Sequence, residues 1–143
     1  MGRASCLPAQ RRGQVSSEYM LSLVAVMVVV ALVMARGLQN IEMDVALSAV
    51  RLGGADFVSS RPYAALGSMN YTVDEGAGTA NISPQYTYYN ATIAAGEAEL
   101  AANYSLAKLA AVFSPNAAGI PANGCLKASY RTYCVLPVVT RPS

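Results

Sequence analysis

Residues 11–20 read Arg-Arg-Gly-Gln-Val-Ser-Ser-Glu-Tyr-Met, and from Tyr19 to Ala35 the chain then runs for 17 residues without a charged side chain. Glu18 and Arg36 bracket this apolar segment. A helix needs about 17 to 25 apolar residues to cross a bilayer, so the segment is long enough to span a membrane. Arginines precede it at positions 3, 11 and 12. Because basic residues stay on the cytoplasmic side, we expect everything after Arg36 to face outward.

The junction between the basic start and the apolar segment resembles the class III signal peptide of archaeal type IV pilins and pilin-like proteins. In that family a short basic leader ends in glycine, a glutamine follows, and a Ser-x-Glu-Tyr element opens the apolar helix. The matching residues here are Arg12-Gly13, Gln14 and Ser16-Ser17-Glu18-Tyr19-Met20. The resemblance covers residues 11–36. It implies that a membrane-embedded prepilin peptidase cuts between Gly13 and Gln14 and leaves the apolar helix on the mature subunit.

The resemblance also implies a function and a set of partners. We expect residues 1–13 to be a leader, residues 14–60 an N-terminal helix that spans the membrane at 19–35 and later forms the core of a filament, and residues 61–143 an outer head. The implied partners are copies of the same chain, the prepilin peptidase, and a pilus assembly ATPase with its membrane platform protein. The chain is then a membrane-anchored precursor that becomes part of an extracellular surface filament and supports surface adhesion.

The spacing of Gln14 and Glu18 has a physical meaning in such an assembly. Residues four apart lie on one face of a helix, so the amino group created at Gln14 and the Glu18 carboxylate share a face. A lone carboxylate is costly to bury among apolar neighbours, and a protonated amine compensates it. The amine can belong to the same chain or to an adjoining subunit, and the family resemblance favours the adjoining one. The alternative is that Glu18 only complements the helix dipole, which is worth about 0.3 to 1 kcal/mol.

Two ordinary export signals compete with this interpretation. A general secretory signal has a basic start and an apolar run of about 7 to 15 residues, and Val33-Met34-Ala35 loosely fits its cleavage site. Arg11-Arg12 also fits the start of a twin-arginine signal. Under the alternative, the chain is a secreted or singly membrane-anchored glycoprotein that does not polymerise.

The composition sets limits on the function. Of the 143 residues, 54% are hydrophobic and 13% charged, which is typical of one small domain with an apolar appendage. The formal charge is +2, but removal of the leader leaves seven basic against eight acidic residues. We therefore predict no nucleic-acid binding. Ser105-Leu106-Ala107-Lys108 fits a Ser-x-x-Lys spacing without the partner motifs of acyl enzymes, and there is no histidine. We predict no enzymatic activity, cofactor or metal site.

The helix is predicted to continue past Arg36 as an amphipathic half. An apolar stripe at helical spacing comprises Leu38, Ile41, Val45, Leu52 and Ala55, whereas Gln39, Asn40, Glu42, Asp44 and Arg51 occupy other faces. Gly37 and the pair Gly53-Gly54 are the positions where bending costs least. Arg61-Pro62 ends the helix, near Ser59.

Beyond Pro62 the sequence favours an α+β fold with a mainly antiparallel β head. Strands are predicted at residues 70–73 and 85–93, and a strand pair at 126–139. Residues 97–113 carry acidic side chains in their first turn and apolar side chains at helical spacing, and Ser114-Pro115 follows them. This pattern favours one short helix, although an alanine-rich strand is the alternative.

Two groups of residues point to modifications outside the cell. The expected mature chain keeps two cysteines, Cys125 and Cys134, which we expect to form a disulfide. Four of the seven asparagines start an N-glycosylation sequence, where chance supplies about one. They are Asn70, Asn81, Asn90 and Asn103, all on the expected outer side. Pro84 follows the Asn81 sequence and disfavours that site.

Overall fold

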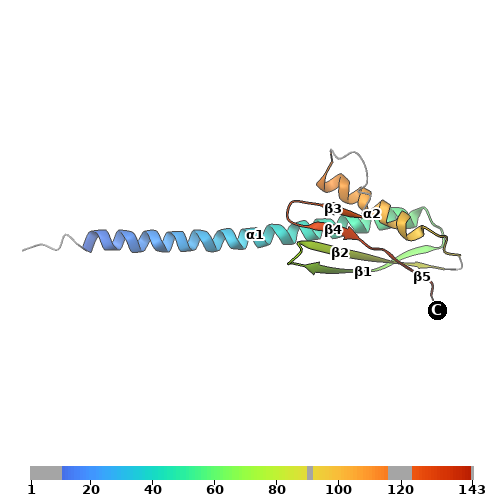
Figure 1. Cartoon of the computed structure of the whole chain (residues 1–143), viewed down its shortest axis with the longest axis horizontal. Helices are drawn as coiled ribbons and strands as arrows, with labels where there is room; N and C mark the ends of the chain where they lie inside the picture. The colour runs from blue at the N-terminus through green and yellow to red at the C-terminus, as the bar shows by residue number, and fades with distance from the viewer. Residues whose placement is uncertain (1–10, 90–91, 116–123, 143) are drawn as a thin grey trace, which may run out of the picture. The chain divides into compact units, whose positions relative to one another are not determined.

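The computed structural model describes residues 11–89, 92–115 and 124–142, with the backbone alone for residues 11–16. The chain divides into two compact units, one up to Asn40 and one from Ile41 onward. Figure 1 shows the order of the helices and strands. They are α1 (Arg11–Ser59), β1 (Ala64–Asp74), β2 (Thr79–Tyr88), α2 (Glu97–Phe113), β3 (Cys125–Lys127), β4 (Thr132–Val135) and β5 (Val138–Thr140). The α+β fold class is confirmed.

Helix α1 ends where the sequence predicts, and local hydrogen bonds explain why. The backbone N–H groups of Ser60 and Arg61 donate to the carbonyls of Phe57 and Val58, at 3.1 and 2.9 Å. These short-range bonds tighten the last turn and satisfy carbonyls that the helix leaves free. The Ser60 hydroxyl donates to the Phe57 carbonyl as well, at 2.6 Å. Pro62 follows and has no N–H with which to continue the helix.

The sheet is mixed rather than mainly antiparallel. Its strands lie in the order β1-β2-β4-β3, and β5 also pairs with β2. The pairs β1–β2 and β3–β4 are antiparallel, whereas β2 runs parallel to both β4 and β5. Parallel strands need a long crossover connection, usually a helix. Because α2 lies between β2 and β4 in the chain, it supplies that connection.

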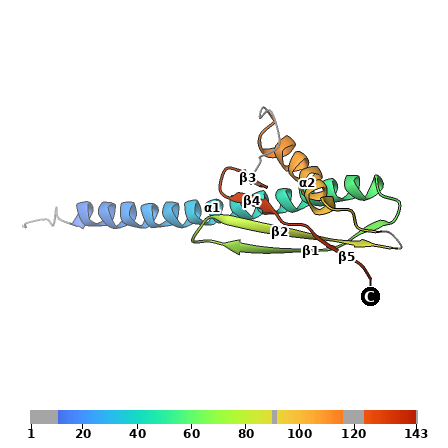
Figure 2. The same cartoon turned by 45° about the vertical axis from the view of Figure 1, so that its right-hand side comes forward.

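The core of the head lies between one face of the sheet and the two helices. Strand β2 alternates strictly, and its buried side chains include Ala80, Ile82, Tyr86 and Tyr88. They pack with side chains of α1 from Met43 to Phe57 and with Ala101, Leu106 and Leu109 of α2. Figure 2 shows this part of α1 and α2 on the same side of β1 and β2. Neither of the two described helices lies against the opposite sheet face, which we call the outer sheet face (Figures 1 and 2).

Helix α2 spans the residues that the sequence favours for a helix, so the alternative of a strand is wrong. Its close approach to α1 depends on Gly53. A Cβ atom added to Gly53 would lie 2.5 Å from the Ser105 Cα and 2.6 Å from the Tyr104 carbonyl oxygen. The glycine that the sequence marks as a weak point of α1 is therefore a packing position, where the missing side chain admits the backbone of α2.

Candidate assembly surface

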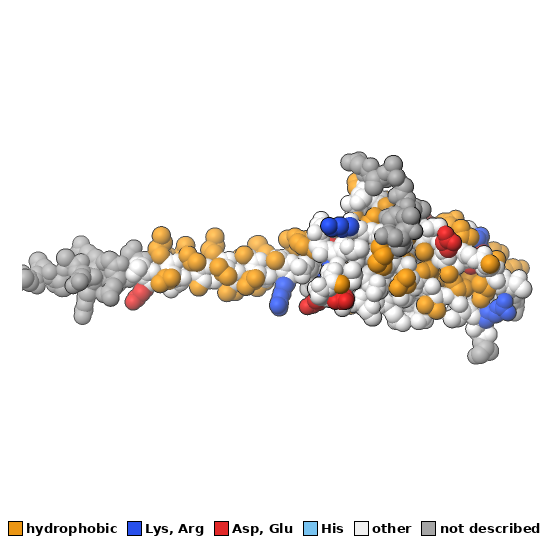
Figure 3. Space-filling model, in the orientation of Figure 1, with side chains coloured by type: hydrophobic (Ala, Val, Ile, Leu, Met, Phe, Trp, Pro, Cys, Tyr) orange, Lys and Arg blue, Asp and Glu red, His pale blue; other side chains and the backbone are white. Residues whose placement is uncertain are grey.

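The N-terminal part of α1 exposes a long, mainly apolar surface. None of the residues from Ser17 to Ala35 is buried, and exposed fractions of large side chains run from 43% at Val30 to 71% at Leu21. Apolar side chains cover this part of the helix in Figure 3. Among the described residues, α1 is the one helix long and apolar enough to cross a membrane, a property that a signal sequence shares.

The predicted processing and assembly residues lie at the start of α1. Gly13 and Gln14 are within the helix, and their side chains lie outside the described part. The Glu18 side chain is exposed. The predicted relationship between the Gln14 amino group and Glu18 therefore stays a prediction.

The second half of α1 has two apolar faces, of which the head covers only one. The face against the sheet and α2 buries Met43, Ala46, Val50 and Phe57, and Ala49, which is also buried, lies at the border with the other face. The stripe identified in the sequence lies on another side of the helix. Ile41 is 60% exposed, Val45 37% and Leu52 62%. The head therefore leaves this stripe open.

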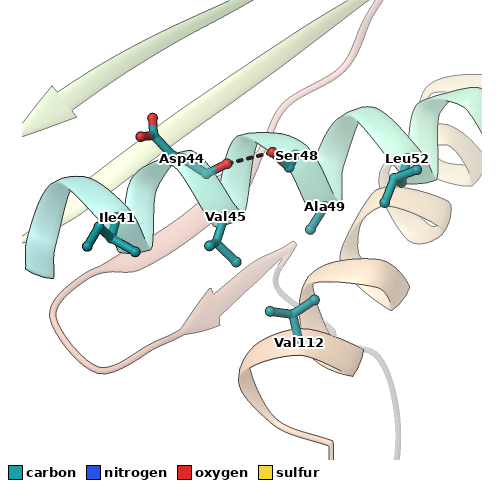
Figure 4. Close-up of a pocket in the computed structure, with 7 residues that line it drawn as sticks. All are labelled: Ile41, Asp44, Val45, Ser48, Ala49, Leu52 and Val112. Carbon is teal, nitrogen blue, oxygen red and sulfur yellow. Dashed lines mark hydrogen bonds between the residues drawn. The ribbon is translucent and has the colours of Figure 1, made fainter.

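A shallow groove of about 310 Å³ runs along the open stripe. It is lined by Ile41, Asp44, Val45, Ser48, Ala49, Leu52 and Val112. Figure 4 shows Val45, Ala49 and Leu52 on the side of α1 that faces Val112 of α2. Val112 is itself 50% exposed. The groove is apolar along its length, and among the described residues Asp44 and Ser48 are the only polar side chains that line it.

A buried carboxylate fixes which face of α1 the head covers. Glu42 is only 7% exposed and accepts hydrogen bonds from the backbone N–H groups of Tyr130 and Arg131, at 3.1 and 3.2 Å. It also accepts one from the Tyr133 hydroxyl, at 3.1 Å. Burial, together with the neighbouring Glu42 charge, raises the pKa of Tyr133. These bonds tie α1 to the turn between β3 and β4.

A second buried carboxylate secures the start of α2. Glu97 accepts hydrogen bonds from the Tyr88 hydroxyl at 2.8 Å and from Arg61 Nε at 3.1 Å. Burial opposes ionisation of Glu97, but the bonds from Tyr88 and Arg61 outweigh it and lower its pKa. Burial, then the Glu97 carboxylate, raises the pKa of Tyr88 to about 12. The hydrogen bond and charge of Glu97 raise the pKa of Arg61.

Sequence reasoning places Glu42 off the apolar stripe, which is correct, but misses that this side is the packed one. The roles of Glu97, Tyr88 and Arg61 are missed as well. A local signal exists for Glu97, because it opens a helix whose first turn is acidic. Nothing local identifies its partners, which lie 9 and 36 residues away.

The remaining predicted sites have clear positions. Cys125 and Cys134 form the predicted disulfide, which joins β3 to β4. Asn70 lies on β1, Asn81 on β2 and Asn103 on α2, whereas Asn90 lies outside the described residues. Ser105 of the Ser-x-x-Lys sequence is fully buried, and Lys108 forms an ion pair with Asp56 at 2.7 Å. Within the part of the chain that is described, no three His, Cys, Asp or Glu side chains gather to hold a metal.

The architecture is pilin-like: a long apolar N-terminal helix precedes a small head with a mixed β-sheet. No protein-family model, no curated protein and no solved structure matches the chain.

Proposed function

We propose that this chain is the structural subunit of an archaeal type IV pilus-like surface filament and that it acts by polymerisation. The observation that carries the proposal is the amount of exposed apolar surface on α1. The apolar run of residues 19–35 accounts for one crossing of a bilayer. The exposed stripe of Ile41, Val45 and Leu52 lies beyond that run and is left open by the head.

A single membrane anchor explains the first apolar surface but not the second. An anchor leaves the stripe in water, where exposed contiguous apolar surface usually marks an interaction site. A second copy of the chain is the natural occupant, because its own α1 offers a helical surface of the same chemistry. A bundle of such helices, with heads on its outside, removes both surfaces from lipid and water.

The proposed assembly begins with processing. The prepilin peptidase cuts between Gly13 and Gln14 and creates a new amino group, and the membrane holds residues 19–35 until the platform protein and ATPase add the subunit. Helix packing inside the filament relies on van der Waals contact, which small residues such as Ala25 and Ala31 favour because they let helices approach closely. The Glu18 carboxylate pairs with the amino group of an adjoining subunit and sets the axial register.

The N-terminus of the native protein tests the proposal. Intact mass and N-terminal sequencing of filaments sheared from cells should give a mature chain that starts at Gln14 and keeps the apolar helix. A soluble product that starts at Arg36 would establish ordinary secretion. An untrimmed leader on finished filaments would contradict the processing step.

Substitution of Glu18 tests the register. Glu18→Ala should leave the peptidase cut in place and lower the yield of filaments seen by electron microscopy. Glu75→Ala is the matched control, because Glu75 is an exposed carboxylate in the turn between β1 and β2. A normal filament yield from Glu18→Ala would remove the charge pair from the mechanism.

A further inference from the structure

Two of the glycosylation sequences lie side by side in register on the sheet. Strands β1 and β2 pair so that Asn70 stands opposite Ser83 and Thr72 stands opposite Asn81. The asparagine of each sequence therefore faces the hydroxyl residue of the other. Cross-strand partners share one face of a sheet. Since Ile82 is buried against the helices, Asn81 and Ser83, its neighbours along β2, point to the outer sheet face together with Asn70 and Thr72.

The Asn70 sequence is the better exposed of the two. Asn70, Tyr71 and Thr72 are all exposed, and among the described strands β1 is an edge strand that pairs with β2 alone. An edge strand offers unpaired backbone groups to an enzyme that binds its substrate as an extended peptide. The Asn81 sequence lies on β2, which is paired on both sides, and Asn81 and Ser83 are only partly exposed.

The Asn103 sequence lies on a helix, so a transferase cannot bind it there as an extended peptide. On a strand, residues i and i+2 point to the same side, but on a helix they do not. Asn103 and Ser105 lie within α2, and Ser105 is fully buried, with its hydroxyl donating to the Val50 carbonyl at 3.5 Å. The hydroxyl that completes the sequence is therefore inaccessible in the folded head.

We propose that the outer sheet face carries a single N-linked glycan at Asn70, that Asn81 stays unmodified on chains that carry it, and that Asn103 is not a glycan site. In the reaction, the Asn70 side-chain nitrogen bonds to the anomeric carbon of a lipid-phosphate-linked oligosaccharide. The bond from that carbon to the phosphate oxygen breaks, lipid phosphate leaves with the electron pair, and the amide loses one proton to the transferase.

The exclusion of Asn81 follows from spacing. Asn70 and Asn81 are diagonal neighbours on the two strands, which places their Cα atoms about 7 to 8 Å apart. A sugar on Asn70 stands over Ser83, directly opposite it, and blocks the approach of a transferase to the second sequence. The glycan also hinders pairing of the β1 edge with a strand of another chain. This edge lacks other protection of that kind, because Ala64–Asp74 contains none of the Lys, Arg or Pro residues that commonly prevent edge pairing.

Site-resolved mass spectrometry of glycopeptides from the native chain tests the proposal. We expect a glycan on Asn70, an unmodified Asn103, and no chain modified at both Asn70 and Asn81. An unmodified Asn70 would overturn the proposal. Modification of Asn103 to the same extent as Asn70 would also overturn it, since that pattern requires transfer before the head folds. A doubly modified chain would overturn the exclusion.

Two substitutions at Thr72 test whether the glycan on Asn70 depends on the hydroxyl of the glycosylation sequence or only on the strand. Thr72→Val keeps a β-branched strand residue but should remove the glycan from Asn70, whereas Thr72→Ser should retain it. A glycan on Asn70 in Thr72→Val would contradict the assignment. The proposal requires only export of the head, so its failure leaves the filament proposal untouched, and a filament failure leaves the glycan assignment testable on the secreted chain.

Discussion

The Glu42 carboxylate and the Tyr133 hydroxyl lie 3.1 Å apart in a hydrogen bond that joins α1 to strand β4. Both side chains are buried, with Glu42 7% and Tyr133 0% exposed. The same carboxylate also accepts two backbone N–H groups from the turn that precedes β4. A single side chain of the helix therefore fixes the position of the hairpin that carries the disulfide.

Replacement of Glu42 by alanine is expected to destabilise the head. The change leaves the Tyr133 hydroxyl and the N–H groups of Tyr130 and Arg131 without their acceptor, and we expect a loss of about 2 kcal/mol in the free energy of unfolding. The measurement is denaturant unfolding of the full chain in detergent, followed by near-ultraviolet circular dichroism of tyrosine. Asp44→Ala is the matched control, because Asp44 is exposed on the same helix, and it should stay within about 0.5 kcal/mol of the wild type. Equal losses from both changes would contradict the role of Glu42.

The raised pKa of Tyr88 predicts a loss of stability at alkaline pH. In the folded chain its pKa is about 12, compared with 10.0 for a free tyrosine, so the fold favours the neutral phenol. Its contribution is fully present below pH 10 and is lost as the pH rises from 10 to about 12. The total effect is on the order of 2 to 3 kcal/mol.

Unfolding measured as a function of pH in wild type and Tyr88→Phe checks this prediction. The variant has no phenol to ionise at position 88, so its stability should fall less steeply in the alkaline window. A residual slope is expected, because burial raises the pKa of Tyr86 as well. Identical slopes in the two proteins would show that Tyr88 ionises without a cost to the fold.

The sequence predicts those parts of the fold that local signals determine. Helix α2 follows from the acidic first turn at Glu97 and the stop at Ser114-Pro115, and the end of α1 follows from Pro62. The disulfide follows from the count of cysteines on the outer side. Each of these signals lies within a few neighbouring residues or follows from the expected membrane topology alone.

The start of strand β2 and its pairing partners are not predicted from local sequence patterns. Pro84 lies near the middle of the strand and disfavours an interior strand, and the predicted strand starts only after it, at 85, instead of at Thr79. Pro84 is tolerated because its partner Met69 stands next to an irregularity in β1, between Leu66 and Met69, where the ladder is already interrupted. The parallel pairing of β2 with β4 and β5 depends on contacts across about 50 residues, which no local pattern encodes.

The sequence reveals only one of the two apolar faces in the second half of α1. The stripe of Ile41, Val45 and Leu52 is found from its spacing. A second apolar face of α1, with Met43, Ala46 and Val50, is interrupted in the sequence by Glu42 and is recognised only when its partners in β4 are known. Which of two apolar faces a helix buries in its own head is decided by tertiary contacts.

Substitution of Gly53 by alanine should separate the packing role of this glycine from its effect on helix propensity. The added methyl group meets the backbone of α2 at Ser105 and Tyr104, which cannot move aside as a side chain does. We expect a loss of about 1 to 3 kcal/mol in the free energy of unfolding. Gly37→Ala is the control, since a Cβ there has no atom of the described residues within 4 Å and the change should favour the helix by up to about 1 kcal/mol. A neutral or stabilising Gly53→Ala would show that α2 can shift away from α1.

Substitution of Leu52 by asparagine should separate assembly from folding. Leu52 is 62% exposed in the single chain, so the change should alter the free energy of unfolding by no more than about 0.5 kcal/mol. In the filament the same position is proposed to pack against another copy, where an asparagine side chain must lose water without a partner. We therefore expect a folded, correctly processed chain and a reduced yield of filaments, measured by electron microscopy of sheared material.

Arg51→Asn is the matched control, because Arg51 is exposed on the same helix but lies off the stripe, and it should assemble normally. Normal assembly of Leu52→Asn would show that the open stripe is not covered by a second copy.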